Sequence, residues 1–279
     1  MNILKLIQNG SKSLKIKNIQ SHVLDSELIA SFVLNCSRED IIANNQKNVN
    51  FEKISFFNKL IKRRQKYEPI SYIINRREFW SKDFEIDKGT LIPRPETEMM
   101  VEGIIQFFKK KRISFLDVGT GSACIIVSIL SENINSFGVG IDISNKAIKV
   151  AGKNILKFNL QNRSKLFNRS YENFYGYKFD LVVSNPPYIK SMDIKNLSKD
   201  IRNYEPKLAL DGGKDGLDVI KKVIYKSRST LKKNGVLAIE IGNGQHKKVS
   251  RLLKLFGYKI KLNIKDYRNN VRSILSVLK

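Results

Sequence analysis

Cysteine and histidine are scarce in this chain of 279 residues, which holds two of each. Cys36 and Cys124 are far apart and in no paired spacing, and the histidines are His22 and His246. Neither a disulfide framework nor a metal site of Cys and His ligands is therefore expected. We predict no metal centre, and the reducing environment of the cytoplasm suits the composition best.

Long apolar runs are absent as well. The most apolar stretches, 118–130 and 235–241, contain glycine or polar residues and are shorter than the roughly 20 residues that a helix needs to cross a bilayer. The start of the chain has no long apolar block followed by small residues, so it does not resemble a signal peptide. The sequence predicts no contact with a membrane.

Acidic residues are few: the chain has 26 Asp and Glu but 51 Lys and Arg, so its formal net charge is +25. Such a charge suits nucleic acid or an acidic protein partner, but lysine is abundant throughout the chain and can raise the charge without a binding surface. The basic run Lys62-Arg63-Arg64 is interpreted as a solvated helix face, with a contact to RNA or to an acidic partner as the alternative.

Three regions differ in their apolar pattern. Residues 1–67 have helical spacing, with a cap at Ser37 and a last helix over 51–66, which predicts a small helical bundle. Within residues 68–95, apolar and polar side chains follow a period of two at 71–74, 78–80 and 83–87, which predicts a β linker. A helix follows over 96–110, with proline before its first turn and acidic residues at its positive end.

Over 96–279 the sequence predicts an α/β domain. Beyond Arg112 the expected strands alternate with expected helices, as in a doubly wound parallel sheet. The last two strands leave no room for a helix between them and should pair antiparallel. The expected strands are 113–118, 138–142, 165–168, 180–184, 235–241, 258–264 and 272–278. The expected helices are 122–132, 144–159, 215–233 and 245–256.

A glycine-rich turn, Gly119-Thr120-Gly121-Ser122-Ala123, follows the first strand of that sheet. Glycine lets the backbone approach a ligand closely. Asp142 ends the next strand about 20 residues later, where an acid can hold a ribose. The pattern indicates an adenosine-type nucleotide, and because Ala123 arrives one position before the third glycine of dinucleotide enzymes, it favours S-adenosylmethionine over NAD. The alternative is a plain tight turn in which Asp142 caps the next helix.

The second motif, Asn185-Pro186-Pro187-Tyr188, ends an apolar strand. The prolines fix the backbone, so Pro186 can present its carbonyl oxygen outward, while Asn185 adds a side-chain acceptor and Tyr188 a flat aromatic face. Two acceptors and a platform suit a planar amino group, whose nitrogen they turn toward a sulfonium methyl group. The methyl donor is already activated, so no strong base is required. The alternative is a proline pair that only terminates the strand.

Together the two motifs resemble amino-methylating class I methyltransferases, which modify adenine, cytosine, guanine or glutamine nitrogens. Further motifs in a fixed order narrow the resemblance to the PrmC/HemK family. These motifs are Leu91-Ile92-Pro93-Arg94-Pro95-Glu96-Thr97-Glu98, Tyr204-Glu205-Pro206 with Ala209-Leu210, Gly212-Gly213 with Asp215-Gly216-Leu217, and Ile239-Glu240-Ile241-Gly242 with Gln245.

The resemblance implies a class I S-adenosylmethionine-dependent methyltransferase domain, a Rossmann-like sheet with an antiparallel last strand, behind a helical domain that recognises the substrate. Members of the family methylate the side-chain amide (N5) of the glutamine in the Gly-Gly-Gln motif of class I peptide chain release factors, which act in translation termination. The release factor is therefore the expected partner, nucleic acid is not required, and the chain is expected to act as a monomer.

The resemblance also assigns residues. It implies that Asn185, Pro186, Pro187 and Tyr188 bind the substrate glutamine, and that Asn185, Pro186 and Tyr188 are the catalytic residues. The residues that it places at S-adenosylmethionine are Gly119, Thr120, Gly121, Ser122, Ala123, Asp142, Tyr171 and Asn185. Tyr171 is the candidate to flank the adenine ring, although Ser170 stands where the family more often has an acid, and Ala123 stands where it usually has glycine.

Two other functions remain open. One is an N6-adenine or guanine methyltransferase acting on DNA or RNA, which would flip its base and bind with a strong salt dependence. The other is a non-catalytic RNA-binding or assembly protein that retains the fold, against which the intact motifs argue.

Overall fold

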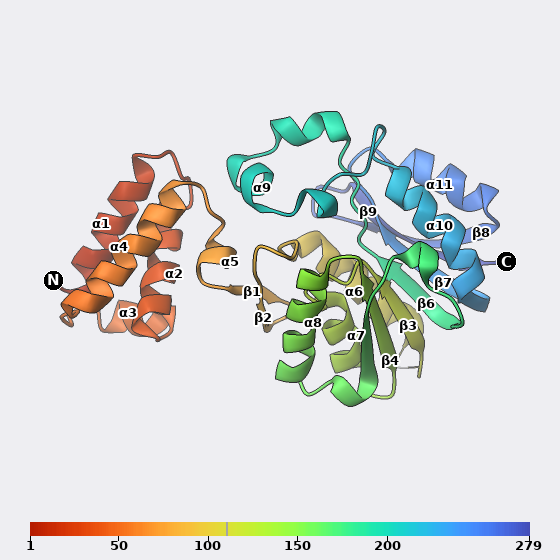
Figure 1. Ribbon diagram of the computed structural model, residues 1–279, viewed down its shortest axis with the longest axis horizontal. Helices are drawn as coiled ribbons and strands as arrows, with labels where there is room; N and C mark the ends of the chain where they lie inside the picture. Colours follow the sequence, from red (N-terminus) through yellow and green to blue (C-terminus); the bar gives the residue numbers. More distant parts are fainter. Residues whose placement is uncertain (110) are drawn as a thin grey trace. The chain divides into compact units, whose positions relative to one another are not determined.

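The computed structural model describes residues 1–109 and 111–279, which divide into two compact units (Figure 1). Unit 1 is Met1–Arg76 together with Ser198–Tyr204, and unit 2 is Arg77–Leu197 together with Glu205–Lys279. The region 68–95, expected as a linker, is divided between them at Arg76. Lys110, the last residue of the helix expected over 96–110, lies outside the described residues.

Unit 1 begins with four helices, α1 (Ile3–Lys15), α2 (His22–Leu34), α3 (Arg38–Ala43) and α4 (Phe51–Gln65). Asn2, Ser37 and Asn50 begin α1, α3 and α4, and each side chain accepts a hydrogen bond from a backbone N–H in the first turn. The helices pack their apolar faces into one core that includes Leu6, Leu14, Ile29, Phe57 and Leu60. This is the helical bundle that the apolar spacing predicts.

The expectation of a strand over 71–74 was wrong, because this segment forms the short helix α5 (Ile70–Ile73). The carbonyl oxygen of Pro69 accepts hydrogen bonds from the backbone of Tyr72 and Ile73. Ser71, Tyr72 and Ile73 are all buried, whereas a strand with one solvated face would alternate buried and exposed residues. The next two strands are present as a hairpin in unit 2, β1 (Arg76–Phe79) and β2 (Lys82–Glu85).

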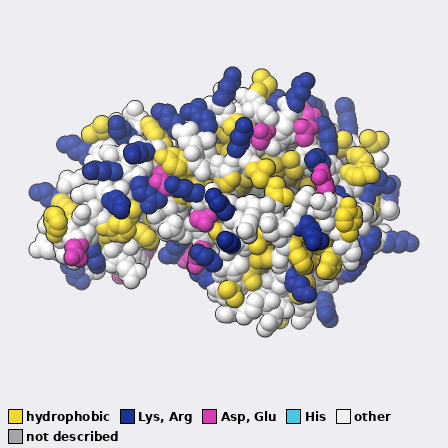
Figure 2. Space-filling view, in the orientation of Figure 1, with side chains coloured by type: hydrophobic (Ala, Val, Ile, Leu, Met, Phe, Trp, Pro, Cys, Tyr) yellow, Lys and Arg dark blue, Asp and Glu magenta, His cyan; other side chains and the backbone are white. Residues whose placement is uncertain are grey.

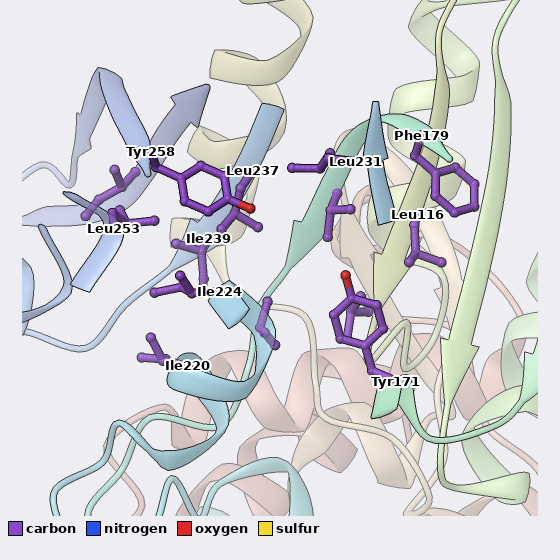
Figure 3. Packing of buried hydrophobic residues seen from close by; sticks show 14 of the residues in the cluster. Leu116, Tyr171, Phe179, Ile220, Ile224, Leu231, Leu237, Ile239, Leu253 and Tyr258 are labelled. Atoms are coloured by element: carbon purple, nitrogen blue, oxygen red, sulfur yellow. The ribbon is translucent and has the colours of Figure 1, made fainter. Parts of the chain in front are cut away.

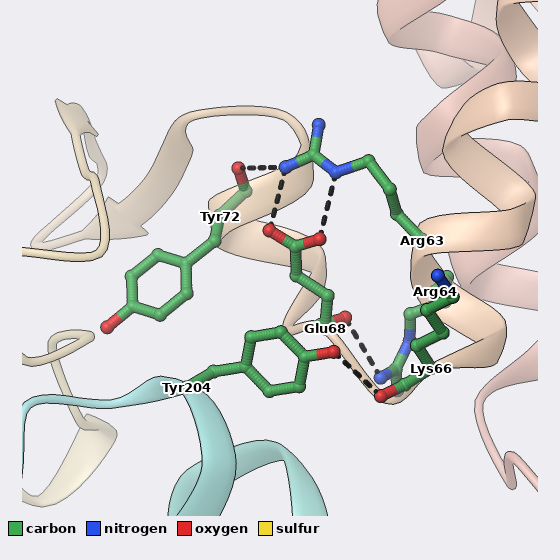
Figure 4. A network of polar contacts seen from close by, with 6 residues as sticks. All are labelled: Arg63, Arg64, Lys66, Glu68, Tyr72 and Tyr204. Carbon is green, nitrogen blue, oxygen red and sulfur yellow. Dashed lines mark hydrogen bonds and ion pairs between the residues drawn. The ribbon is translucent and has the colours of Figure 1, made fainter.

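The basic run at the end of α4 is mostly part of the fold of unit 1 (Figure 4). Arg63 donates from Nε and Nη2 to the two carboxylate oxygens of Glu68, at 2.9 and 2.8 Å. Arg64 is buried and donates from Nε to Asp25 Oδ2 at 2.6 Å. The interpretation of the run as a solvated face therefore holds only for Lys62, which is exposed.

A short segment from far along the chain completes unit 1. It contains the helix α9 (Lys199–Tyr204). The hydroxyl of Tyr204 donates to the backbone oxygen of Lys66 at 2.8 Å (Figure 4), and the ammonium of Lys199 lies 4.7 Å from the ring centroid of Tyr67. These contacts explain why Ser198–Tyr204 belongs with the helical bundle although its neighbours in sequence belong to unit 2.

Unit 2 contains a seven-stranded sheet in the order β5-β4-β3-β6-β7-β9-β8. The first five of these strands run parallel, and β9 is antiparallel to both β7 and β8, which confirms the predicted doubly wound sheet and the antiparallel last strand. The strands are β3 (Ser114–Val118), β4 (Phe137–Asp142), β5 (Ser164–Asn168), β6 (Phe179–Ser184), β7 (Leu231–Glu240), β8 (Tyr258–Lys265) and β9 (Val271–Leu278).

Helices cover both faces of this sheet (Figure 1). One face carries α6 (Pro95–Phe108), α7 (Cys124–Glu132) and α8 (Asn145–Lys157), and the other carries α10 (Asp218–Thr230) and α11 (His246–Leu255). The helix expected over 215–233 is shorter, because 231–233 belong to β7. Short 3₁₀ turns lie at Gln161–Arg163, Tyr171–Asn173, Ser191–Asn196 and Lys207–Ala209.

The sheet brings the two predicted motifs to one place. β3 lies between β4 and β6, so the strand order reverses at this point, and ligands of doubly wound proteins bind at the carboxyl ends of the strands there. The glycine-rich turn follows β3 and the Asn-Pro-Pro-Tyr motif follows β6. Val118 and Ser184, the last residues of the two strands, are register partners.

Basic side chains are distributed over the surface. On the face drawn in Figure 2, Lys and Arg side chains are spread over the molecule and are not gathered in one patch. Across the described residues, no helix is both long and apolar enough to cross a membrane. The same part of the chain holds no cluster of His, Cys, Asp and Glu that could bind a metal ion.

Candidate active site

Backbone hydrogen bonds hold the glycine-rich turn against β4. The N–H groups of Gly119 and Thr120 both donate to the carbonyl oxygen of Ile141, at 2.9 and 3.0 Å. Gly119 and Gly121 have φ values of +76° and +56°, in the left-handed region that favours glycine. The turn is therefore fixed on the neighbouring strand by its own main chain.

Asp142 lies at the end of β4 and joins two elements. Its Oδ2 accepts from the N–H of Gly121 at 3.0 Å, and its Oδ1 accepts from the N–H of Ser144 at 2.9 Å. The alternative role as a helix cap is only part of the arrangement, because the Ser144 hydroxyl itself caps α8 by accepting from Ala147. Burial raises the pKa of Asp142, and each carboxylate oxygen keeps lone pairs for a further donor.

Space and unpaired polar atoms occur together at this turn. A side chain built on Gly119 would meet no atom within 4 Å. In the described part of the chain, the buried Ser122 Oγ and Asp117 Oδ1 have no hydrogen-bond partner. Burial raises the pKa of Asp117 to about 7, although its Oδ2 accepts from the hydroxyl of Thr120. The turn thus offers an open approach to the backbone with unused polar atoms beneath it.

Ala123 stays in the turn and does not begin the helix, since α7 starts at Cys124. Its φ of +62° is one that a residue with a side chain adopts at a cost of about 1–2 kcal/mol. The carbonyl oxygen of Ser122 accepts from Asn154 Nδ2 at 3.0 Å, and Asn154 is fully buried. The conformation is therefore imposed by the packing around the turn.

The Asn-Pro-Pro-Tyr motif begins where the Ser184 hydroxyl donates to the backbone oxygen of Val118 at 2.8 Å, next to the glycine-rich turn. Asn185 Nδ2 donates to Thr97 Oγ1 at 3.0 Å. Neither Asn185 Oδ1 nor the carbonyl oxygen of Pro186 accepts a hydrogen bond from any described residue. Two acceptors on adjacent residues are thus available to a ligand.

The tyrosine of the motif is fixed at its hydroxyl. Tyr188 donates to Glu240 Oε1 at 3.3 Å and accepts from Arg272 Nη2 at 3.2 Å. Burial raises the pKa of the Tyr188 hydroxyl, so this group stays protonated at neutral pH. Its ring is held in place and the hydroxyl is not available as a base.

Glu240 is the centre of the polar groups behind the motif. It is fully buried at the end of β7, and its Oε2 accepts from the Thr97 hydroxyl at 2.6 Å. Burial raises the pKa of Glu240 to about 7, against the opposing effect of the Thr97 hydrogen bond and of Arg272. The carboxyl is therefore linked to both Asn185, through Thr97, and Tyr188.

The backbone of the motif rests on two glycines and a glutamine. A Cβ at Gly212 would come within 2.8 Å of the Pro187 oxygen, and one at Gly216 within 2.5 Å of the Tyr188 oxygen. Gln245 Nε2 donates to the carbonyl oxygens of Tyr188 and Gly216, at 3.0 and 3.1 Å. The loop at 212–217 and the residue Gln245 therefore support the Asn-Pro-Pro-Tyr backbone directly.

A further ion pair joins two of the remaining motifs. Arg94 Nη2 lies 2.5 Å from Glu205 Oε1, and the side chain of Glu205 is 1% exposed. The other oxygen of Glu205 accepts from the backbone of Ile92 at 3.4 Å. This contact ties the segment before α6 to the segment after α9 within unit 2.

The predicted site residues meet at this sheet edge, apart from the side chain of Tyr171. Tyr171 is 9% exposed, packs in the core beside Leu116 and Leu231, and bonds through its hydroxyl to Thr230 Oγ1 at 2.6 Å (Figure 3). This position counts against the prediction that Tyr171 flanks adenine. The 3₁₀ turn at Tyr171–Asn173 directs the ring into the core, which a pattern of residues does not reveal.

Four polar residues behind the motif were not predicted as part of the site. Thr97, Glu240 and Gln245 lie in segments on which the family resemblance depends, but their spacing suggests no role. Arg272 lies in no motif. Thr97, Glu240 and Gln245 could have been found only by asking what their motifs contact, and no signal in the sequence points to Arg272.

Comparison with known proteins shows matches along the chain. Residues 5–74 match the family model "PrmC N-terminal domain", and residues 109–271 match the model "Methyltransferase domain". Among solved structures, the catalytic domain of hMettl16 in complex with the MAT2A 3′UTR hairpin 6 has a TM-score of 0.56 at 14% identity, covering 70% of this chain and 75% of that one. A methyltransferase from Pyrococcus furiosus has a TM-score of 0.53 at 18% identity, covering 70% of this chain and 88% of that one. At these identities the structures show the fold alone.

Relatives named "Release factor glutamine methyltransferase" match over nearly the whole chain. The protein from Buchnera aphidicola subsp. Schizaphis graminum is 38% identical, covering 98% of each chain. Those from Clostridium acetobutylicum and Caulobacter vibrioides are 36% and 34% identical, covering 95% and 99% of this chain and 94% and 96% of their own. With these identities over this length, the chain belongs to the release factor glutamine methyltransferase family.

Proposed function

We propose that this protein transfers a methyl group from S-adenosylmethionine to the side-chain amide nitrogen of the glutamine in the Gly-Gly-Gln motif of class I peptide chain release factors. The observation that carries the proposal is the pair of free acceptors, Asn185 Oδ1 and the Pro186 carbonyl oxygen, beside the glycine-rich turn. The names of its full-length relatives support the choice of substrate.

S-Adenosylmethionine fits the glycine-rich turn in three respects. The backbone at Gly119 is open to close approach, Asp142 keeps lone pairs for the ribose hydroxyls, and the buried Asp117 carboxyl behind the turn favours a nearby cationic group. Ile143, next to Asp142, is 55% exposed and offers an apolar surface for the adenine in place of Tyr171. When bound, the cofactor supplies an activated methyl group on a sulfonium.

The Asn-Pro-Pro-Tyr residues bind and orient the glutamine amide. An amide –NH₂ has two hydrogens, and two acceptors on adjacent residues can hold both. This arrangement fixes the direction of the nitrogen lone pair, and positioning of this kind can supply a large share of a rate enhancement. The ring of Tyr188, held by Glu240 and Arg272, provides a fixed aromatic surface beside it.

Among the described residues, no side chain that contacts Asn185 or Tyr188 is free to act as a base. The Tyr188 hydroxyl stays protonated, and Arg272 is a permanent cation. Glu240 is enclosed by Thr97 and Tyr188, which use both of its oxygens. The chain's contribution is therefore orientation of the amide and stabilisation by fixed hydrogen bonds.

The proposal is tested by locating the transferred methyl group. The protein is incubated with S-adenosylmethionine and a class I release factor and, in a separate reaction, with total RNA, and the products are digested and analysed by mass spectrometry. We expect one added methyl group on the glutamine of the Gly-Gly-Gln motif. A release factor with Gln→Asn at that position serves as the control and should stay unmodified.

A nucleic-acid substrate is the outcome that would overturn this choice. The net charge of +25 would suit it, yet the basic side chains on the visible face are not gathered in one patch (Figure 2). A methylated base together with an unmodified glutamine would identify the protein as a nucleic-acid amino-methyltransferase.

A further inference from the structure

The –NH₂ group of the Asn185 side chain belongs to a series of hydrogen bonds that connects residues from three parts of unit 2. Asn185 follows β6, Thr97 lies in the first turn of α6, and Glu240 ends β7. Asn185 Nδ2 donates to Thr97 Oγ1 at 3.0 Å, and the Thr97 hydroxyl donates to Glu240 Oε2 at 2.6 Å. Thr97 is 2% exposed and Glu240 fully buried, so water does not replace these partners.

The direction of these hydrogen bonds follows from their chemistry. A hydroxyl has one hydrogen, and an ionised carboxylate can only accept. Because Thr97 gives its hydrogen to Glu240, it can offer Asn185 only a lone pair, and Asn185 must face it with the –NH₂ group. The opposite orientation would place the oxygen of Asn185 against the oxygen of Thr97. The amide oxygen of Asn185 therefore points away from Thr97.

The same carboxylate also has its second oxygen occupied. Tyr188 donates to Glu240 Oε1, and the charged Arg272 donates to the Tyr188 hydroxyl. Thr97, Arg272 and Tyr188 favour the ionised form of Glu240 against burial, which raises its pKa to about 7, so the carboxylate is an acceptor toward Thr97 above about pH 7. One buried carboxylate thus orients two residues of the Asn-Pro-Pro-Tyr motif.

We propose that Thr97 is a positioning residue of the methyl transfer, fixed by Glu240, and that it acts by holding the oxygen of Asn185 as an acceptor for the substrate –NH₂ group. The proposal rests on the proposed function for the identity of that substrate. Thr97 touches neither substrate nor cofactor in this scheme. Without it, Asn185 could rotate about its last torsion and present its own –NH₂ group, which repels the hydrogens of the substrate amide.

Thr97→Val removes the hydroxyl and keeps the shape, while Thr97→Ser keeps the hydroxyl. We expect Thr97→Val to lower kcat by roughly 10- to 100-fold, the range for loss of one oriented partner in a catalytic site, and Thr97→Ser to stay within about 3-fold of wild type. The affinity for S-adenosylmethionine, measured by calorimetry, should be unchanged in both. A split between kcat and cofactor affinity would not arise from general damage to the fold.

Thr230→Val is the matched control for stability. Thr230 is also a buried threonine in unit 2, and its hydroxyl bonds to Tyr171, away from the motif. Thermal unfolding of both valine variants shows how much stability each loses. Thr230→Val should keep the kcat of the wild type, and an equal loss of kcat in the two variants would overturn the proposal.

A double-mutant cycle tests whether Thr97 acts through Asn185. In the Asn185→Ala background there is no amide to orient, so adding Thr97→Val should change kcat by less than about 2-fold. Losses that multiply, or a Thr97→Val protein with the kcat of the wild type, would overturn the proposal. If the methyl group appears on a nucleic-acid base, the proposed substrate is wrong, and the same cycle measured on that base decides the role of Thr97.

Discussion

The glycine-rich turn and the Asn-Pro-Pro-Tyr motif follow neighbouring strands but are held in different ways. The turn is fixed by its own backbone and by residues of the next strand, Ile141 and Asp142. The motif is fixed by side chains from distant parts of the chain, since Thr97 and Glu240 are separated by 143 positions. A site of this kind combines a local element that can be recognised from spacing with one that depends on the complete fold.

Each of the two regions also contains one buried carboxyl group. The largest expected effect is the change in unfolding free energy with pH that follows from protonation of these two groups. Burial raises the pKa of Asp117 and of Glu240 to about 7, whereas in an unfolded chain both titrate near 4. Between about pH 4 and pH 7 the folded state therefore holds protons that the unfolded state has released. The free energy of unfolding should fall as the pH rises through this window, on the order of 4 kcal/mol for each group, and level off above it.

Asp117→Asn and Glu240→Gln test this for the turn and for the motif separately. Each substitution should remove the contribution of its own carboxyl group to the pH dependence of the unfolding free energy. Denaturant unfolding at about pH 5 and about pH 8 measures this dependence. The double variant should lose most of the difference in unfolding free energy between the two pH values, and the remainder belongs to groups such as Asp142, whose pKa burial also raises. A wild-type protein that gains stability between these values would show that the two carboxyls are ionised in the folded state.

The second prediction separates the two regions by function. Asn185→Ala should lower kcat by roughly 10²-fold or more, because the substrate amide loses one of its oriented acceptors. The affinity for S-adenosylmethionine should fall far less than kcat, although the resemblance also places Asn185 at the cofactor. Single-turnover methylation and calorimetry measure the two quantities. Near-wild-type turnover would remove Asn185 from the catalytic residues.

The third prediction compares two glycines in the same unusual conformation. Gly216 has φ +75° and no room for a Cβ, which would lie 2.5 Å from the Tyr188 oxygen, whereas Gly119 has φ +76° and open space. Gly216→Ala should cost about 2–3 kcal/mol of stability and also lower kcat, because the motif must shift. Gly119→Ala should cost only the strain of about 1–2 kcal/mol and weaken cofactor binding.

Gly152→Ala is the control for this pair. Gly152 lies inside α8, and a Cβ there would meet no atom within 4 Å. Alanine should raise stability at this position by up to about 1 kcal/mol. Thermal unfolding orders the three variants, and a Gly216→Ala protein as stable as the Gly119→Ala protein would contradict the tight packing of the loop.

The smallest expected effect is a loss of cofactor affinity on substitution of Asp142, which binds the glycine-rich turn. Asp142→Asn keeps an oxygen for one backbone N–H but loses the charge and one acceptor, so cofactor affinity should fall by about 10-fold, or about 1.4 kcal/mol. At saturating S-adenosylmethionine kcat should be nearly unchanged. Calorimetry with the cofactor measures the first quantity. A loss confined to kcat would place Asp142 with the motif and not with the cofactor.

The order of strands and helices could be predicted well from the sequence. The strand expected over 138–142 is observed as Phe137–Asp142, and the helix expected over 245–256 as His246–Leu255. Buried strands bounded by glycine and polar turns give clear patterns, as do amphipathic helices with caps. The segment 71–74 was assigned wrongly because a run of apolar residues fits a buried helical turn as well as a strand.

The support of the site could not be predicted in this way. Thr97 and Glu240 meet only because α6 packs against the sheet beside β7, and no spacing in the sequence encodes that contact. The inward direction of Tyr171 likewise depends on the 3₁₀ turn in which it lies. Sequence patterns located the glycine-rich turn and the Asn-Pro-Pro-Tyr motif, whereas the groups behind them required the tertiary structure.

The place of α9 in unit 1 has a consequence for protein engineering. The helical bundle is a discontinuous unit, because Ser198–Tyr204 comes from the segment that follows the Asn-Pro-Pro-Tyr motif. A fragment that ends at Arg76 lacks the Tyr204 hydroxyl that binds the backbone of Lys66. A chimera that exchanges the bundle between relatives must therefore transplant two separate stretches of chain, and the second lies only ten positions beyond Tyr188.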